Sequence, residues 1–142
     1  MKGELLEMVE REVLGWPGVS KERGGGGRGR SGFRVPPATV YRHGSRQIGH
    51  IHHTTGMADI TFPREIHDAL ISDGRAKLHP AGFANVVSYH IREPEDVPKV
   101  VELFRMSYER ALLAAERRSQ RTEGRNPTTS RVKGATRSLD RP

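Results

Sequence analysis

The longest regular element that the sequence predicts is an α-helix in its last third. Apolar residues recur there at spacings of four, three, four and four, which places them on one helical face: Val97, Val101, Phe104, Tyr108 and Leu112. Pro94-Glu95-Asp96 comes just before them, and proline and acidic residues are typical of a first helical turn. A helix with one apolar face packs that face on a sheet or on other helices, so the chain must supply such a partner.

Shorter patterns supply this partner. Glu4–Leu14 has apolar residues at every fourth position and glutamates between them, which predicts an amphipathic helix. Thr39–His43 and Gln47–His53 are separated by Gly44-Ser45, a pair that suits the type II′ turn of a β-hairpin. The other predicted elements are an edge strand at Phe33–Val35, a strand at Met57–Phe62, a short helix from Pro63, at its first position, to Gly74, and a strand at Asn85–Ile91.

These elements predict an α+β fold in the order α-β-β-β-α-β-α. The hairpin favours a small, mostly antiparallel sheet of about four strands with helices packed on it. We expect one domain over residues 1–116, interrupted by a mobile Gly/Arg-rich loop at residues 21–32. After Glu116 the apolar pattern stops, so residues 117–142 are predicted to form a basic disordered tail.

The net charge of +7 is concentrated in the two segments that are expected to be flexible. Residues 117–142 carry eight basic and two acidic side chains, and residues 21–32 carry four basic and one acidic side chain. Arginines in flexible segments can contact nucleic-acid phosphates weakly and in a salt-dependent way. Only Phe33 lies near the loop for base stacking. Weak nucleic-acid contact and a merely solubilising role both remain open for these two segments.

Composition excludes several other classes of protein. The chain has no cysteine, which excludes disulfides, thiolate metal ligands and a cysteine nucleophile. No apolar run approaches the roughly 20 residues that span a bilayer, and residues 1–14 lack the apolar core of a secretory signal. We therefore expect no membrane contact and a cytoplasmic location. Gly24–Ser31 formally fits a phosphate-binding loop, but it leads into Pro36-Pro37 rather than into a helix, which argues against nucleotide binding.

A series of short segments resembles the luciferase-like domain family. The segments follow one another in the order and with the spacing of that family; they are Gln47–His52, Ala58–Arg64, Gly74–Ala76, His79-Pro80, Val87–Ile91, and Glu95–Val97 with Leu103–Tyr108. Two features depart from the family pattern. The Gly/Arg-rich loop resembles an insertion, and Val86 stands where a tryptophan or a similar aromatic residue is expected.

The resemblance implies the fold and a chemistry, but it transfers no catalytic residue. The family is named for fungal luciferases, which oxidise a small aromatic pyrone with molecular oxygen and need no metal or organic cofactor. The resemblance therefore implies no cofactor requirement here. Most members are short bacterial proteins without an assigned activity, and a shared fold does not fix a shared reaction.

The residues best suited to chemistry gather on the predicted hairpin and the strand after it. His50 and His52 are two apart on a strand, so both side chains leave the same face about 7 Å apart. Asp59 follows on the next strand and can serve as a third metal ligand or orient an imidazole, and His79 and His90 can complete the set. Two histidines and a carboxylate suit zinc or non-haem iron. Three interpretations stay open: a metal site at His50, His52, Asp59 and His79, a cofactor-free site with His50 or His52 as base, and purely structural roles.

Two functions are consistent with these observations. As an enzyme, the domain would use His50, His52 and Asp59 as catalytic residues for oxygen-dependent or hydrolytic chemistry on a small organic molecule in a nearby pocket. As a non-catalytic binding module, it would contact nucleic acid or a protein partner through residues 21–32 and 117–142. The sequence supports both and predicts no oligomeric state.

Overall fold

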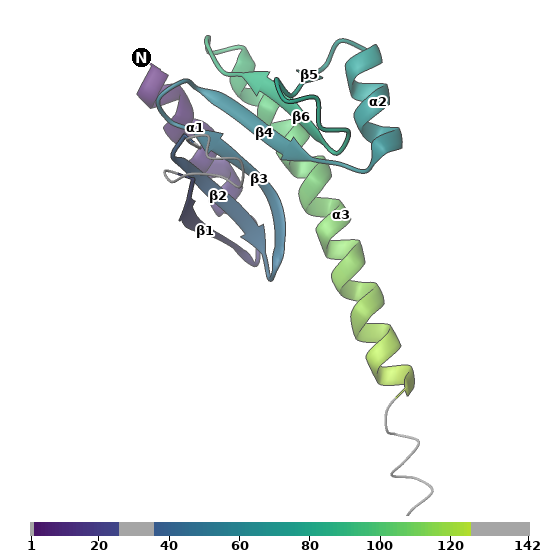
Figure 1. The fold of residues 1–142 in the computed structure, drawn as a ribbon. Coiled ribbons are helices and arrows are strands. Elements are labelled where there is room, and N and C mark those ends of the chain that lie inside the picture. Colours follow the sequence, from purple (N-terminus) through teal and green to yellow (C-terminus); the bar gives the residue numbers. More distant parts are fainter. Residues whose placement is uncertain (1, 26–35, 126–142) are drawn as a thin grey trace, which may run out of the picture. The chain divides into compact units, whose positions relative to one another are not determined.

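The computed structural model describes residues 2–25 and 36–125. The chain divides into two compact units, Met1–Glu109 and Arg110–Pro142. The first unit contains the helices α1 (Lys2–Leu14) and α2 (Arg64–Ser72), the sheet, and the beginning of α3 (Asp96–Arg125), which continues into the second unit (Figure 1). Among the described residues, none of the helices is long and apolar enough to cross a bilayer.

Six strands form one sheet in the first unit, and every neighbouring pair is antiparallel. Their order across the sheet is β1-β2-β3-β4-β6-β5 (Figure 1). Their bounds are Val19–Gly24 for β1, Ala38–His43 for β2, Arg46–His52 for β3, Met57–Thr61 for β4, Lys77–Leu78 for β5 and Val86–His90 for β6. The predicted α+β class and the antiparallel sheet are confirmed. The chain order is α-β-β-β-β-α-β-β-α, with two strands more than predicted.

Side chains alternate across the sheet and give it an apolar face and a polar face. In the central strands, Ile51 and Ile60 are fully buried on the apolar face, so their sequence neighbours His50 and Asp59 point to the polar face. A register shift between Tyr41 and Arg42 places an extra residue in β3. This bulge lets Ile48 join the apolar core although simple alternation would put it beside His50.

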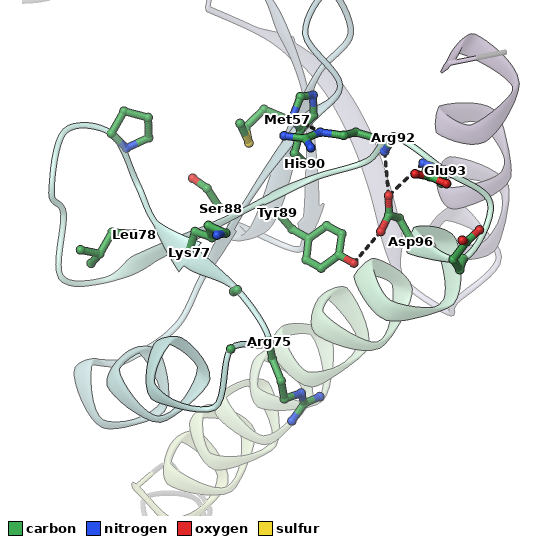
Figure 2. A pocket seen from close by; sticks show the side chains of 14 residues that line it. Met57, Arg75, Lys77, Leu78, Ser88, Tyr89, His90, Arg92, Glu93 and Asp96 are labelled. Atoms are coloured by element: carbon green, nitrogen blue, oxygen red, sulfur yellow. Dashed lines mark hydrogen bonds between the residues drawn. The ribbon is translucent and has the colours of Figure 1, made fainter.

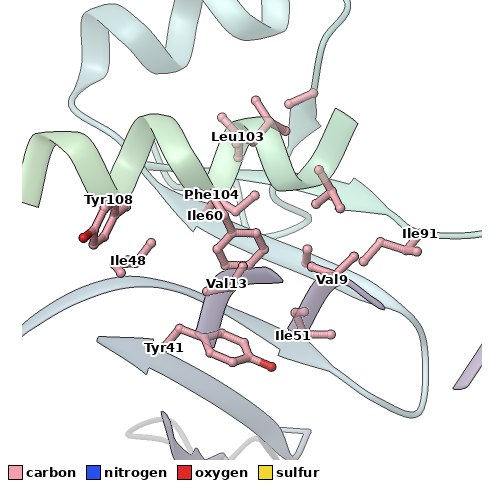
Figure 3. Packing of buried hydrophobic residues seen from close by; sticks show 14 of the residues in the cluster. Val9, Val13, Tyr41, Ile48, Ile51, Ile60, Ile91, Leu103, Phe104 and Tyr108 are labelled. Atoms are coloured by element: carbon pink, nitrogen blue, oxygen red, sulfur yellow. The ribbon is translucent and has the colours of Figure 1, made fainter. Parts of the chain in front are cut away.

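Helix α1 and the beginning of α3 supply the other half of the apolar core (Figure 3). The buried side chains of α1 are Leu5, Leu6, Val9 and Val13, and those of α3 within the first unit are Val100, Leu103, Phe104, Ser107 and Tyr108. The predicted stripe on α3 is therefore partly wrong, because Val97 and Val101 are only partly buried. Val100 and Leu103 are also apolar, so the sequence allowed two overlapping stripes, and packing selected the one centred on Phe104.

Gly49 in β3 is required by the close approach of α3. A Cβ atom at this position would lie 2.9 Å from Cε1 of Phe104 and 2.9 Å from the backbone oxygen of Asp59. The Phe104 ring also meets Tyr41 edge to face, with ring centroids 5.8 Å apart. Glycine thus lets the aromatic core sit directly under the strand that carries both histidines of the polar face.

The hairpin prediction is confirmed in its turn as well as in its strands. His43 pairs with Arg46 across Gly44-Ser45, and Gly44 has a φ of 64° while no described residue other than glycine has a positive φ. A positive φ at the first turn position only is the signature of the type II′ turn. The third predicted strand and the last one are also found, as β4 and β6.

Other boundaries correct the predictions made from sequence. Residues 21–24 belong to β1 and pair with β2, so this part of the expected mobile loop at residues 21–32 is a strand, while residues 26–32 lie outside the described residues. The backbone of Lys21 to Gly24 is held by this pairing, which sequence patterning did not reveal. The expected edge strand Phe33–Val35 lies outside the described residues. Pro63 is the N-cap of α2 and not its first helical residue.

Helix α3 continues to Arg125, so residues 117–125 of the expected disordered tail are helical, while the domain boundary at residue 116 stays a prediction. The segment after Glu116 lacks an apolar face, but its glutamate, arginine and glutamine residues have good helix propensity. The Thr122 hydroxyl also donates to the carbonyl of Arg118 within this segment. Local propensity thus extends the helix beyond the point where the apolar pattern stops. Residues 126–142 of the expected tail lie outside the described residues.

Candidate functional site

Strand register brings the candidate residues together on the polar face of the sheet. His50 in β3 pairs directly with Asp59 in β4, and Asp59 pairs with Ser88 in β6. His52 lies two residues along β3 from His50 and shares its face. Directly opposed residues on neighbouring strands have Cβ atoms about 4.5–5.5 Å apart. The sheet itself therefore gathers two imidazoles, a carboxylate and a hydroxyl in one place.

The Asp59 carboxylate is the centre of this cluster and is only 2% exposed. Its Oδ2 atom lies 3.1 Å from Nε2 of His50 and 3.2 Å from Nε2 of His52, while Ser88 Oγ donates to Oδ1 at 2.6 Å. Burial alone raises the pKa of the Asp59 carboxyl, but hydrogen bonds from His50, His52 and Ser88 outweigh it and hold the pKa well below its usual range. Asp59 is therefore a buried carboxylate anion.

The opposite ring nitrogens of the two histidines are held by the protein. His52 Nδ1 lies 3.2 Å from the backbone oxygen of Pro37, and His50 Nδ1 lies 2.9 Å from Oε1 of Gln47. Both oxygens can only accept, so each Nδ1 carries a hydrogen. The bond to Asp59 raises the pKa of the His52 imidazole, while partial burial opposes this rise. Both rings are thus fixed in orientation, with Nε2 directed at Asp59.

His79 lies at the edge of the cluster, and its ring carries its hydrogen on Nε2 rather than on Nδ1. Its Nε2 atom lies 3.6 Å from Oδ2 of Asp59, while its Nδ1 accepts the backbone N–H of Ala81 at 2.9 Å. A neutral imidazole that accepts at Nδ1 carries its hydrogen on Nε2. His79 therefore presents a donor to Asp59, whereas the predicted metal site needs a bare nitrogen.

His90 is not part of the cluster. Its Nε2 lies 2.9 Å from the backbone oxygen of Thr55, and its Nδ1 accepts from Nε of Arg92. These contacts tie the end of β6 to the turn before β4. The structure thus gathers four of the five candidate residues and assigns His90 to a backbone contact.

Three groups can together act as ligands of one metal ion. Each of His50, His52 and Asp59 offers one donor atom, and these three atoms lie within 4.8 Å of one another. Two imidazole nitrogens and one carboxylate oxygen are the donor set expected for zinc or non-haem iron. The side chains of His50 and His52 are 26% and 13% exposed, whereas that of Asp59 is 2% exposed.

A cavity of about 520 Å³ touches the cluster at Ser88 only, because His50, His52 and Asp59 are not among the residues that line it. Figure 2 shows the side chains around this cavity. Ser88 lines this cavity and also donates to Asp59, and Met57, which pairs with His52 across β3 and β4, forms another part of the wall. The far wall holds Tyr89, whose hydroxyl donates to Asp96 at 2.8 Å. Burial and this bond raise the pKa of Tyr89 to about 12. The cavity therefore runs from the serine of the cluster to a neutral tyrosine.

Sequence reasoning missed the groups that hold the cluster in place. Ser88 binds Asp59, Gln47 binds His50, and the carbonyl of Pro37 binds His52. Strand alternation with His90 could have placed Ser88 on the polar face, but its pairing with Asp59 depends on a register that no local pattern encodes. Gln47 reaches His50 only because of the bulge in β3.

Val86, the position where an aromatic residue was expected, pairs with Thr61 at the end of β6 and is partly buried. It lies two residues from Ser88 and therefore faces the polar side of the sheet. The change from the family pattern thus falls on the face that carries the cluster and not in the apolar core.

Comparison with known proteins gives one match. Residues 45–107 match the family model described as Luciferase domain, which confirms the resemblance inferred from the sequence. The matched residues run from the turn before β3 into α3 and include His50, His52, Asp59, His79 and Ser88. No significant match was found among curated proteins or among solved structures.

Proposed function

We propose that this luciferase-like domain is an enzyme whose reactive centre is the cluster of His50, His52 and Asp59. The substrate would be a small organic molecule in the adjoining cavity, and the chemistry would be oxygen-dependent or hydrolytic. The observation that carries this proposal is the buried Asp59 carboxylate, on which two imidazole Nε2 atoms and a serine hydroxyl converge.

Burying the Asp59 carboxylate among these groups costs folding free energy. Burying a carboxylate removes its hydration, and the cost is offset only by hydrogen bonds or by cations. An apolar side chain at position 59 would stabilise the sheet at a lower desolvation cost than a buried carboxylate. Strongly perturbed ionisable groups beside a cavity are typical of functional sites. The balance of costs favours chemistry over a structural role for Asp59.

The adjoining cavity supports a small-molecule substrate. Its volume of about 520 Å³ lies within the roughly 300–1,000 Å³ that is typical of ligand pockets. Its wall combines apolar groups such as Met57 and Leu78 with three basic and three acidic residues, which are Arg75, Lys77, Arg92, Glu93, Glu95 and Asp96. A planar organic molecule that carries an acidic or carbonyl oxygen would find both apolar contact and a positive partner there. Ser88 would bring the molecule close to Asp59.

Turnover assays test this proposal directly. Purified untagged protein would be screened for oxygen consumption with a panel of hydroxypyrones and phenols, and for hydrolysis with a panel of p-nitrophenyl esters. Activity should fall at least tenfold in Asp59→Asn and in the double variant His50→Ala/His52→Ala. Asp68→Asn is the matched control, because the Asp68 side chain is 61% exposed on α2, away from the cluster.

Two results would contradict the proposal. Turnover that survives unchanged in Asp59→Asn would place the reactive centre elsewhere. A protein that neither turns over nor saturably binds any compound of the two panels, by ligand-observed NMR, would favour a non-catalytic role.

A binding module is the second candidate function, and one observation favours it. Arg117, Arg118 and Arg121 are exposed on the described end of α3. Spacings of three and four residues place Arg121 beside both of the others on the helix surface. The segment expected to be a disordered tail therefore presents a basic stripe that can contact phosphates.

Removal of residues 117–142 tests the binding module. Retention on single-stranded RNA or DNA at low salt should disappear in the truncated protein and weaken steeply with salt in the full chain. The triple variant Arg117→Gln/Arg118→Gln/Arg121→Gln isolates the stripe from the rest of the segment. Equal retention by the full and truncated proteins would overturn this second candidate.

A further inference from the structure

We propose that His50, His52 and Asp59 form a binding site for one divalent transition-metal ion, with Gln47, Pro37 and Ser88 as the groups that orient the ligands. The metal would serve the enzyme proposed above, so this inference deepens the proposed function. The observations that support the metal site are separate ones. It goes beyond the cofactor-free chemistry that the family resemblance implies.

The first argument is the placement of hydrogens in the cluster. The Nδ1 atoms of His50 and His52 donate to Oε1 of Gln47 and to the carbonyl of Pro37. Each ring therefore turns its other nitrogen, Nε2, toward Oδ2 of Asp59, at 3.1 Å for His50 and 3.2 Å for His52. A histidine that donates at Nδ1 and binds metal through Nε2 is the usual arrangement of a metal-ligating imidazole.

The second argument is the convergence on one buried oxygen atom. Asp59 is 2% exposed, and its Oδ2 atom faces the Nε2 atoms of two rings whose centroids are 5.0 Å apart. One divalent ion can contact both nitrogens and the carboxylate oxygen at once.

The third argument is distance. When ligand atoms lie about 2.0–2.2 Å from a metal, neighbouring ligand atoms are about 3.0–3.4 Å from each other in octahedral or tetrahedral geometry. The two Nε2–Oδ2 distances are 3.1 and 3.2 Å. The three donor atoms come from neighbouring positions on two paired strands and lie within 4.8 Å of one another.

The remaining neighbours define the character of the site. Ser88 donates to Oδ1 of Asp59, so Oδ2 is the oxygen that faces the two Nε2 atoms and would bind the metal. His79 offers a hydrogen at Nε2, so it stands as a donor to Asp59 or to a metal-bound water and not as a fourth ligand. Three protein ligands leave open coordination positions, which is typical of catalytic rather than structural metal sites. Nitrogen donors favour zinc or iron over magnesium or calcium.

Metal titration of the full, untagged chain tests the inference. After chelator treatment, Zn²⁺ in air and Fe²⁺ without oxygen would be titrated separately, and bound metal would be measured by mass spectrometry. We expect one ion per chain, a raised melting temperature, and loss of at least a hundredfold in affinity in His50→Ala/His52→Ala. Gln47→Ala should weaken binding about 10–100-fold, as is usual for a residue that orients a ligand.

His53→Ala is the matched control, because His53 follows His52 directly and contacts Thr39 outside the cluster. Visible absorption of the Co²⁺-loaded wild-type chain gives a readout that needs no variant. A nitrogen–oxygen ligand field should appear with one equivalent of Co²⁺. Circular dichroism would establish that each variant is folded before its affinity is compared.

The outcomes separate this inference from the proposed function. No binding of Zn²⁺, Fe²⁺ or Co²⁺ by the wild type, or equal binding by the double histidine variant, overturns the metal site. Turnover that depends on Asp59 and persists in chelator overturns the metal site while the proposed enzyme stands. Stoichiometric metal without turnover of any tested compound supports the site and contradicts the enzyme.

Discussion

Two pairs of aromatic rings meet edge to face on opposite sides of the same sheet. On the apolar face Tyr41 and Phe104 have centroids 5.8 Å apart, and on the polar face His50 and His52 have centroids 5.0 Å apart. The first pair is fully buried among the core side chains of α1 and α3. The second pair is partly exposed and is oriented by oxygen atoms at both ring nitrogens.

The comparison shows two different ways to fix a ring. Phe104 is held by close packing, which contributes stability through the apolar area that it buries. The imidazoles of His50 and His52 are held by directional bonds to Asp59, Gln47 and Pro37, which add little stability but define where each lone pair points. Damage to the apolar face should therefore change the free energy of unfolding, and damage to the polar face should mainly change metal binding or turnover.

The largest effect is expected from Phe104→Ala. Removing a fully buried ring leaves a cavity beneath β3, and such substitutions typically cost about 3–5 kcal/mol of unfolding free energy. Urea denaturation followed by circular dichroism measures this loss. Met8→Ala is the control, since Met8 is 46% exposed on α1 and its loss should be within about 0.5 kcal/mol of zero. A cost for Phe104→Ala below that of Asp59→Ala would reverse the comparison between the two faces.

Gly49→Ala should destabilise the fold by about 1–3 kcal/mol, because the new methyl group overpacks the contact with Phe104 and the Asp59 backbone. The cost should shrink when Phe104 is already alanine, and a double-mutant cycle measures this coupling. Gly3→Ala serves as the control, because nothing lies within 4 Å of a Cβ atom at that position. An equal loss of unfolding free energy at Gly49 and Gly3 would mean that α3 does not pack closely against β3 at Gly49.

Asp59→Ala should cost about 1–3 kcal/mol in chelator, because the buried hydroxyl of Ser88 loses its acceptor. The two imidazoles are partly exposed and can be hydrated in place of the lost carboxylate, which limits the damage. Thermal unfolding in the presence of EDTA measures this effect without any contribution from metal. Asp73→Ala is the control, because Asp73 is exposed at the end of α2. A loss as large as that of Phe104→Ala would show that the polar cluster is a structural centre.

The smallest effect is a pH dependence at the edge of the apolar face. Burial raises the pKa of Glu10, but hydrogen bonds from Tyr41 and Lys21 outweigh it and lower the pKa below the usual value of 4.5. A lowered pKa means that the carboxylate stabilises the fold above pH 4.5 and that this contribution disappears as the pH falls through the lower, folded-state pKa. Glu10→Gln should therefore cost about 1 kcal/mol or less near pH 7, and this cost should shrink as the pH falls below 4.5.

Denaturation of both proteins across this pH range measures the difference. Glu7→Gln on the exposed side of the same helix should show no such pH-dependent change. A cost for Glu10→Gln that persists unchanged at pH 3 would mean that the Tyr41 bond stabilises the fold regardless of charge.

Local patterns in the sequence were sufficient for most elements of the fold. The period of the apolar residues predicted α1 and the start of α3, and Gly44-Ser45 predicted both the hairpin and its turn type. Strand alternation correctly put His50 and His52 on one face. These features depend on interactions between residues close in sequence, which is why a single sequence reveals them.

Where local signals were weak, the predictions were incomplete or wrong. The strand β1 carries a mixed polar sequence and exists through its pairing with β2, and the two-residue strand β5 exists through its pairing with β6. On α3, adjacent valines at 100 and 101 gave the sequence no means of choosing which one the core would bury.

The sequence by itself determined which residue types are available for chemistry and which of them share a strand face. Only the tertiary structure decided that Asp59 stands between His50 and Ser88, that a bulge turns Gln47 toward His50, and that a carbonyl of the chain fixes the hydrogen on His52. The physical reason is that the side-chain period of a strand is local. The register between strands is set by the packing of residues far apart in the chain, and a shift of one residue would turn the cluster into the core.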